Sequence, residues 1–179
     1  MVMKNPVVST MFLIMAVSMF LFLACGKDPQ NLDLLTAIDR EQSDVVQRLL
    51  DSGTDPNEVP VPAGIELEGA YPLHLAVVKG NKEIVQFLLE NGAKIDLKAR
   101  NKDEAPPLSW AAFFGQKDMV LLLIKSGAAM NVVDANRATP LDAADFAWEL
   151  SRADKEKARI HMDIITILKS NGGKSARDL

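Results

Sequence analysis

The chain has 179 residues, of which 48% are hydrophobic and 25% are charged, and its formal net charge is −4. This balance excludes a disordered acidic or low-complexity protein, and it lacks the excess of basic residues with which nucleic-acid-binding proteins neutralise phosphates. A single cysteine and two histidines exclude a framework of internal disulfides and a cysteine-rich zinc site.

The first 24 residues form a segment distinct from the rest of the chain. Lys4 is the only charged side chain before Lys27, and residues 7–24 form an uncharged, mainly apolar stretch of 18 residues. A basic start, an apolar stretch and a small final residue are typical of an export signal, so we expect residues 1–24 to be a signal peptide. The stretch is also near the lower limit for a membrane-spanning helix, which leaves an uncleaved anchor as the alternative.

Cys25 directly follows this stretch, in the sequence Phe22-Leu23-Ala24-Cys25. The segment resembles the end of a bacterial lipoprotein signal, in which a small residue precedes the lipidated cysteine. The resemblance implies that Cys25 carries lipid and that residues 25–31 link this anchor to the folded part. Because Gly26 follows, it also implies the periplasmic face of the outer membrane. Acyl chains hold a protein on a membrane by about 0.8 kcal/mol per buried CH₂. The alternative is an unmodified cysteine.

Four copies of one pattern follow. In each copy an apolar helical stretch ends at a glycine, a residue that commonly terminates helices; these stretches are residues 46–53, 85–92, 120–127 and 165–172. A second helical stretch with a proline at its second position, which suits a first helical turn, precedes the last three copies, at residues 71–76, 106–112 and 139–144. Tyr71 and Gly92 are 21 positions apart, as are Pro106 and Gly127. This agreement indicates a true repeat.

These motifs are those of ankyrin repeats. The chain resembles that family in Pro72-Leu73-His74-Leu75-Ala76, in Gly127-Ala128-Ala129-Met130-Asn131 and in Thr139-Pro140-Leu141. The resemblance implies an all-α fold, with about four helix-turn-helix repeats of a solenoid in a domain at residues 32–173. The expected repeats are residues 32–70, 71–105, 106–138 and 139–173, and a tail follows at 174–179. Each repeat would bury its apolar face against its neighbour, and the dissimilar ends of the array favour a monomer.

The fourth copy is longer than the others. Thr139 and Gly172 are 33 positions apart, 12 more than in the middle copies, and the excess at residues 148–159 contains neither glycine nor proline. This composition favours helix. We therefore expect an extended C-terminal helical pair that caps the stack.

The sequence contains no set of residues typical of catalysis. His74 belongs to the repeat motif, in which the family resemblance implies that its side chain ties neighbouring backbone together. We expect His161 at the start of the last helix, on the surface or in a cap. Gly172-Gly173-Lys174-Ser175 resembles the end of a phosphate-binding loop, but it follows a helix rather than preceding one. We predict no enzymatic activity, no cofactor and no metal site.

The family resemblance places the partner-binding surface on the hairpin tips and on the exposed faces of the first helices. Carried over position by position, this surface holds Asp39, Arg40, Val78, Lys79, Phe113, Phe114, Phe146 and Ala147. Of these, Val78, Lys79 and the three phenylalanines are the candidate contacts. Exposed aromatic clusters are typical of binding sites, and Phe114 is the phenylalanine that we most expect to be exposed. The alternative is that one or two phenylalanines pack under the C-terminal pair. Trp110 takes the place of a core leucine and should be buried.

Two long hairpins carry contrasting charges. Residues 54–70 contain four acidic side chains and no basic one, whereas residues 94–104 contain four basic and three acidic side chains. We expect Glu66 and Glu68 on the first hairpin and Lys102 on the second to contact or steer a partner. The alternative is that both hairpins are solvated loops without a binding role.

Together these features predict an exported, lipid-anchored protein of the bacterial envelope that binds another protein and no nucleic acid. It would act as a scaffold or protector of an envelope protein. The alternative is an immunity or inhibitor protein that blocks a periplasmic toxin or hydrolase. A scaffold would leave its partner active, whereas an inhibitor would form a tight one-to-one complex in which the partner loses activity.

Overall fold

The computed structural model describes residues 32–58, 60–64 and 66–179. The predicted signal peptide, Cys25 and the rest of the predicted linker lie outside the described residues. The described part forms α-helices and no strands, which confirms the predicted all-α class. Four helix-turn-helix pairs follow one another: α2 (Leu34–Asp39) with α3 (Ser43–Asp51), α4 (Pro72–Lys79) with α5 (Lys82–Glu90), α6 (Pro107–Phe113) with α7 (Lys117–Lys125), and α8 (Pro140–Ser151) with α9 (Lys155–Ser170).

Local signals in the sequence decide where these helices begin and end. Helices α4, α6 and α8 each have a proline in the first turn, where the missing N–H has no intrahelical partner to lose. At the start of α8, Thr139 accepts a hydrogen bond from the Asp142 amide, and Asp142 accepts one from the Thr139 amide. This reciprocal capping fixes the first turn of α8. Gly80 ends α4 with φ of 73°, a conformation that a Cβ disfavours.

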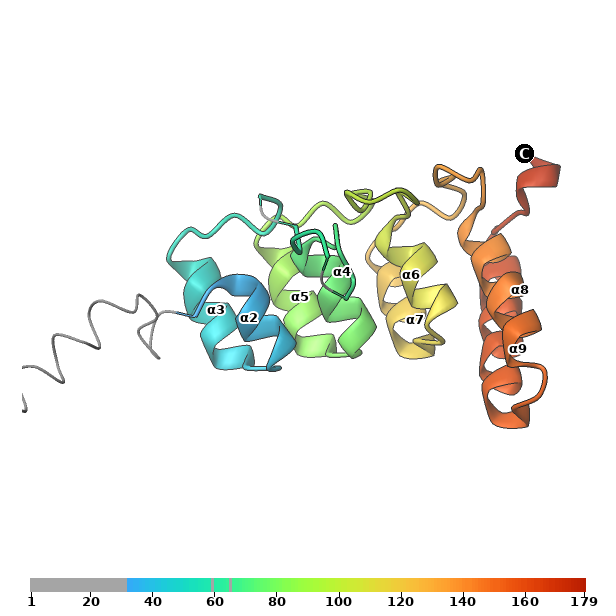
Figure 1. Cartoon of the computed structure of the whole chain (residues 1–179), viewed down its shortest axis with the longest axis horizontal. Coiled ribbons are helices and arrows are strands. Elements are labelled where there is room, and N and C mark those ends of the chain that lie inside the picture. Colours follow the sequence, from blue (N-terminus) through green and yellow to red (C-terminus); the bar gives the residue numbers. More distant parts are fainter. Residues whose placement is uncertain (1–31, 59, 65) are drawn as a thin grey trace, which may run out of the picture. The chain divides into compact units, whose positions relative to one another are not determined.

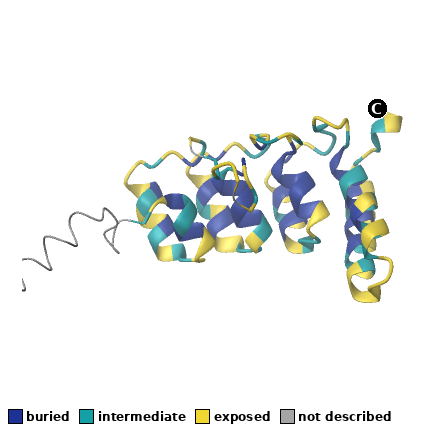
Figure 2. Cartoon of the chain, in the orientation of Figure 1, coloured by how far each residue is buried: buried dark blue, intermediate teal, exposed yellow. Residues whose placement is uncertain are grey.

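The first helices of the four pairs stack against one another, and so do the second helices. Helices α2, α4, α6 and α8 contact each other in chain order, and α3, α5, α7 and α9 do the same (Figure 1). The side chains between the pairs are fully buried, among them Ile38, Ile84, Leu108, Leu123 and Leu168. Figure 2 shows exposed positions on the opposite faces of the same helices. Because each helix pair is short, it gains most of its apolar burial from its neighbours.

Side-chain hydrogen bonds also join each pair to the next on the loop side, and we call them the inter-repeat bonds. Asn57 donates from Nδ2 to the Gly92 carbonyl (3.0 Å) and accepts at Oδ1 from the Lys94 amide (2.8 Å). Asn131 makes the same two bonds, of 3.2 and 2.8 Å, to the segment after α9. Asp96 accepts a bond of 3.0 Å from an amide after α7. These bonds fix the spacing of consecutive loops.

The last pair is longer than the others, as predicted. Helices α8 and α9 have 12 and 16 residues, whereas α4 to α7 have seven to nine. In Figure 1 the two helices extend beyond the turns of the preceding pairs. Asp154 caps α9 by accepting from two backbone amides. Among the described residues, no helix combines the length and the apolar composition needed to cross a membrane.

The prediction for His161 was wrong. Because α9 begins at Lys155, His161 lies nearly two turns inside the helix rather than at its start. Its side chain is buried, and Nε2 lies 3.1 Å from the carbonyl oxygen of Phe113, the last residue of α6. His161 therefore joins the long C-terminal helix to the preceding pair.

Candidate functional site

Four aromatic side chains from α6 and α8 form one cluster, which we call the aromatic cluster: Trp110, Phe113, Phe114 and Phe146. The ring centroids of Phe113 and Phe114 are 5.2 Å apart, and those of Phe113 and Phe146 are 6.3 Å apart. Trp110 lies 5.9 Å from Phe114 and is buried, as predicted. The three phenylalanines are 37%, 44% and 58% exposed in chain order. The cluster thus has a buried base and an exposed rim.

The last turn of α6, which carries Phe113 and Phe114, is held from both sides. His161 contacts the Phe113 carbonyl from α9. In the middle of α6, Trp110 packs edge-on against the His74 ring, with centroids 5.1 Å apart. Gly115 follows at φ of 72°, which lets the chain turn directly into α7. These contacts hold the backbone that carries Phe113 and Phe114 in place.

His74 is a structural residue, as the family resemblance implied. Its Nδ1 accepts a bond from the Tyr71 amide (3.3 Å), and Nε2 donates to the carbonyl of Ala105 (3.0 Å), just before α6. Desolvation by burial lowers the pKa of His74 to about 4, although the bond to Ala105 opposes this effect. The ring is therefore neutral at physiological pH.

A cavity of about 540 Å³ opens over the aromatic cluster, and we call it the aromatic groove. Besides the cluster it is lined by polar residues from two consecutive hairpins and by the start of α8: Asn101, Asp103, Ser109, Asp134, Asn136 and Asp142, with Ala105, Ala138 and Ala143. Its volume is within the range of about 300–1,000 Å³ that is usual for binding pockets. The groove has an apolar base and a polar, acidic edge.

Asp142 is a fixed negative charge at this edge. Desolvation tends to raise its pKa, but hydrogen bonds from Thr139, Ser175 and Ala176 outweigh that effect and lower the pKa below its ordinary value. The Ser175 hydroxyl donates to Oδ1 at 2.7 Å and the Ala176 amide to Oδ2 at 2.9 Å. The segment after α9 therefore packs back onto the start of α8.

Ser109 supplies an unusual polar atom at the base of the groove. The residue is 2% exposed, and its buried Oγ has no hydrogen-bond partner among the described residues. A buried hydroxyl without a partner is costly in a folded protein.

The predicted helical residues divide into two sets. Phe113, Phe114 and Phe146 come together in the aromatic groove, and Phe114 is exposed, as expected. Phe146 is the most exposed of the three, and Phe114 packs on Trp110. Val78 is half-buried beside Trp110, and Lys79 forms an ion pair of 2.7 Å with Asp39 of the first pair. Neither lines the groove.

The predicted hairpin residues are also apart from the groove. Glu66, Glu68 and Lys102 are exposed, and Glu68 accepts a bond from the Gly64 amide within its own hairpin. None of the three lines the aromatic groove. Their role in binding stays a prediction.

The acidic edge of the groove was missed by the sequence analysis. Asp103 and Asn136 occupy equivalent positions 33 residues apart in consecutive hairpins, and Asn136 donates to Asp103 across the repeats at 3.3 Å. Because equivalent positions of consecutive repeats lie next to each other, the 33-residue offset between Asp103 and Asn136 could have predicted their contact from the sequence. In the described residues, no group of three or more histidine, cysteine or acidic side chains is placed to hold a metal ion.

Comparison with known proteins agrees with this architecture. A model of the family described as ankyrin repeats (3 copies) matches residues 34–134, more than half of the chain. The pair α8–α9 lies beyond the matched residues and continues the same packing. No curated protein matches the sequence. On the extent of the family match and on its helix-turn-helix stack, the chain belongs to the ankyrin-repeat family.

Proposed function

We propose that the protein binds a partner protein of the bacterial envelope in the aromatic groove and holds it near a membrane. Ankyrin repeats are protein-interaction modules, and this chain carries them over most of its described length. The observation that carries the proposal is the exposure of three adjacent phenylalanines over a cavity. Aromatic side chains that are free in solution and buried in a complex contribute strongly to binding.

The membrane address rests on the sequence before the repeats. Lys4, the apolar stretch at residues 7–24 and Cys25 support export followed by lipidation. Replacement of Cys25 by alanine should then abolish labelling with a fatty-acid analogue. Equal labelling of the unmodified and Cys25→Ala chains would contradict lipidation at Cys25, and an unlabelled unmodified chain that keeps residues 1–24 and stays on the membrane would favour an uncleaved anchor.

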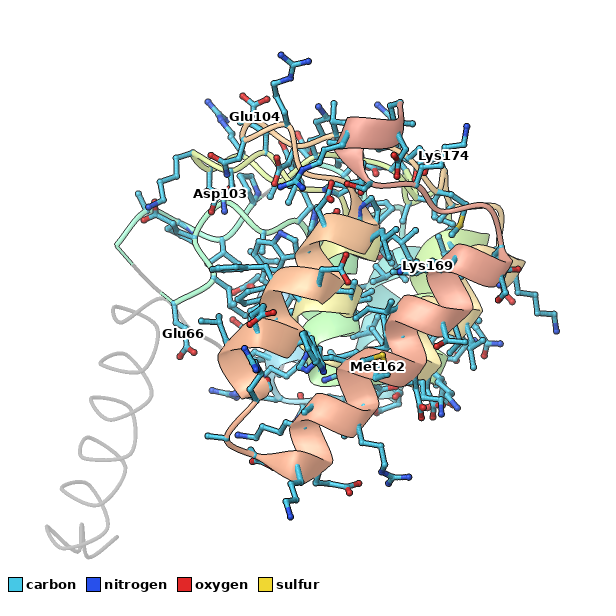
Figure 3. The ribbon with its side chains drawn as sticks, turned by 90° about the vertical axis from the view of Figure 1, so that its right-hand side faces the viewer. Glu66, Asp103, Glu104, Met162, Lys169 and Lys174 are labelled. Atoms are coloured by element: carbon cyan, nitrogen blue, oxygen red, sulfur yellow. The ribbon has the colours of Figure 1, made fainter. Side chains whose placement is uncertain are left out.

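The binding proposal is tested by capture of partners from envelope extract. The Phe113→Ser, Phe114→Ser chain should lose the partner that the unmodified chain captures. A matched control is Leu121→Ser, Met162→Ser, which removes two equally exposed apolar side chains. Figure 3 shows Met162 on α9, whereas Asp103 and Glu104 lie on the loop side of the helices. Circular dichroism should show equal helix content in all three proteins.

The outcomes of this capture experiment answer two questions, namely where the partner binds and what binding does to the partner. If both variants capture the partner equally, the groove is not the binding surface. If only the phenylalanine variant fails, the activity of the captured partner then decides its relation to this protein. Retained activity indicates a scaffold or protector, and lost activity in a one-to-one complex indicates an inhibitor or immunity protein.

A further inference from the structure

The charged residues that line the aromatic groove are all of one sign. Its lining includes three carboxylates, Asp103, Asp134 and Asp142, and neither lysine nor arginine. None of the three carboxylates belongs to an ion pair within the described part of the chain. A cleft bordered by unpaired charge of one sign attracts a group of the opposite sign.

Two of these carboxylates have an oxygen available for contact. Asp134 uses Oδ1 to accept from the backbone amides of Asn136 and Ala138 (2.8 Å each), and Asp103 uses Oδ1 to accept from Asn136. The other oxygen of each has no donor among the described residues. Asp142 differs, because hydrogen bonds from its own neighbourhood occupy both of its oxygens. Asp103 and Asp134 are therefore the contact points, and Asp142 adds to the local field.

The apolar base of the groove lies next to these contact points. It consists of the Phe113, Phe114 and Phe146 rings over Trp110. A bulky apolar side chain buries surface against such rings, and a cation near their faces gains further attraction. The lining also includes Ser109, whose buried hydroxyl has no hydrogen-bond partner among the described residues.

We propose that the aromatic groove holds an extended segment of the partner protein in which an arginine or lysine adjoins a bulky apolar side chain. The cationic group contacts Asp103 and Asp134, and the apolar side chain packs on the three phenylalanines. The cavity of about 540 Å³ accommodates a few side chains rather than the flat face of a domain. This inference rests on the proposed function, because it names the chemistry of the partner at that site.

The test is a titration of the full-length chain with three peptides that differ at one position. The probes are acetyl-Leu-Arg-Phe-Leu-amide and its counterparts with glutamine or glutamate in place of arginine. Trp110 fluorescence reports binding in a Trp148→Phe background, which removes the second tryptophan. We expect the arginine peptide to bind roughly 3- to 10-fold more tightly than the glutamine peptide, since exposed charge pairs are individually weak. The glutamate peptide should bind least, and added salt should reduce the differences.

Two variants with the same change in net charge complete the test. Asp103→Asn, Asp134→Asn preserves the Oδ1 acceptors of both turns and should bind the arginine and glutamine peptides equally. Asp51→Asn, Glu90→Gln removes two exposed carboxylates outside the groove and should keep the preference of the unmodified chain. Loss of the preference in both variants would show an effect of net charge and would overturn the inference.

Other outcomes overturn it as clearly. Equal binding of arginine and glutamine peptides by the unmodified chain contradicts the assigned chemistry, and so does no binding up to about 1 mM, a concentration that detects even weak complexes. If the partner from envelope extract still requires Phe113 and Phe114 in either case, the proposed function stands and only the chemistry of the occupant is wrong. If capture is also independent of the two phenylalanines, both proposals fail.

Discussion

His74 is wholly buried and bridges the Tyr71 amide to the Ala105 carbonyl just before α6, so a drop in pH from 7 to 5 should weaken the stack through this residue. In the unfolded chain a histidine takes up a proton near pH 6.5, whereas burial lowers the pKa of His74 in the folded protein to about 4. Between these values the unfolded state binds more protons. Stability is therefore complete above pH 6.5 and declines as the pH falls toward 4.

The size of this effect follows from the two pKa values. The interval from 6.5 to about 4, at roughly 1.4 kcal/mol per pH unit, gives a maximum loss of about 3 kcal/mol. At pH 5 the same linkage relation gives a loss of about 2 kcal/mol. Since domains are commonly stable by only about 5–15 kcal/mol, this loss is readily measured.

Urea unfolding followed by circular dichroism at pH 7 and pH 5 measures the effect, with His74→Gln as the comparison. Glutamine keeps a donor for Ala105 and does not titrate, so the pH-dependent loss in the variant should be smaller by about 2 kcal/mol. His161 and the carboxylates are common to both proteins and cancel in the comparison. Equal losses in the two proteins would refute the reasoning, as would an NMR titration of folded His74 with a midpoint near 6.5. The NMR measurement also serves if the variant fails to fold.

Two further predictions concern the loops. Gly69→Ala should destabilise the protein by about 1–3 kcal/mol or detach the first hairpin, because the added Cβ would lie 2.4 Å from the Arg100 carbonyl oxygen at φ of 75°. Gly64→Ala, where φ is 80° with no atom within 4 Å, should cost less in the same thermal unfolding assay, and an equal cost would contradict the steric argument. Asn131→Ala removes two inter-repeat bonds. One of them is the 2.8 Å bond from the Lys174 amide to Asn131, which corresponds to the bond from the Lys94 amide to Asn57. The substitution should cost about 1–3 kcal/mol and increase amide exchange in α9 more than in α3; a uniform increase would contradict local coupling.

Local features of the fold were predictable from the sequence. The register of the repeats followed from helix-ending glycines and first-turn prolines, which act within a few residues of the chain. The long C-terminal pair followed from an inserted stretch without glycine or proline. Burial of Trp110 was predicted from its place in the repeat, and the structure confirms it.

The features that the sequence analysis missed depend on contacts between repeats. His161 is buried because α9 starts early enough to carry it against the end of α6, and nothing in its immediate sequence indicates this. The acidic edge of the groove depends on two hairpins that fold over the same cavity. The analysis assigned charge to whole hairpins and singled out Lys102, although Asp103, the next residue, lines the groove.

The inter-repeat bonds also determine how the stack responds to mechanical tension. Each bond joins only consecutive repeats, so a pull along the row loads the junctions in series and the weakest one opens first. Hydrogen bonds break within about an ångström of stretch beyond their normal length, which makes the opening abrupt. In the aromatic groove, the three phenylalanines come from the third and fourth repeats, at α6 and α8. A partner bound there would act as a clamp across that junction, and the force needed to separate the two repeats would rise when the groove is occupied.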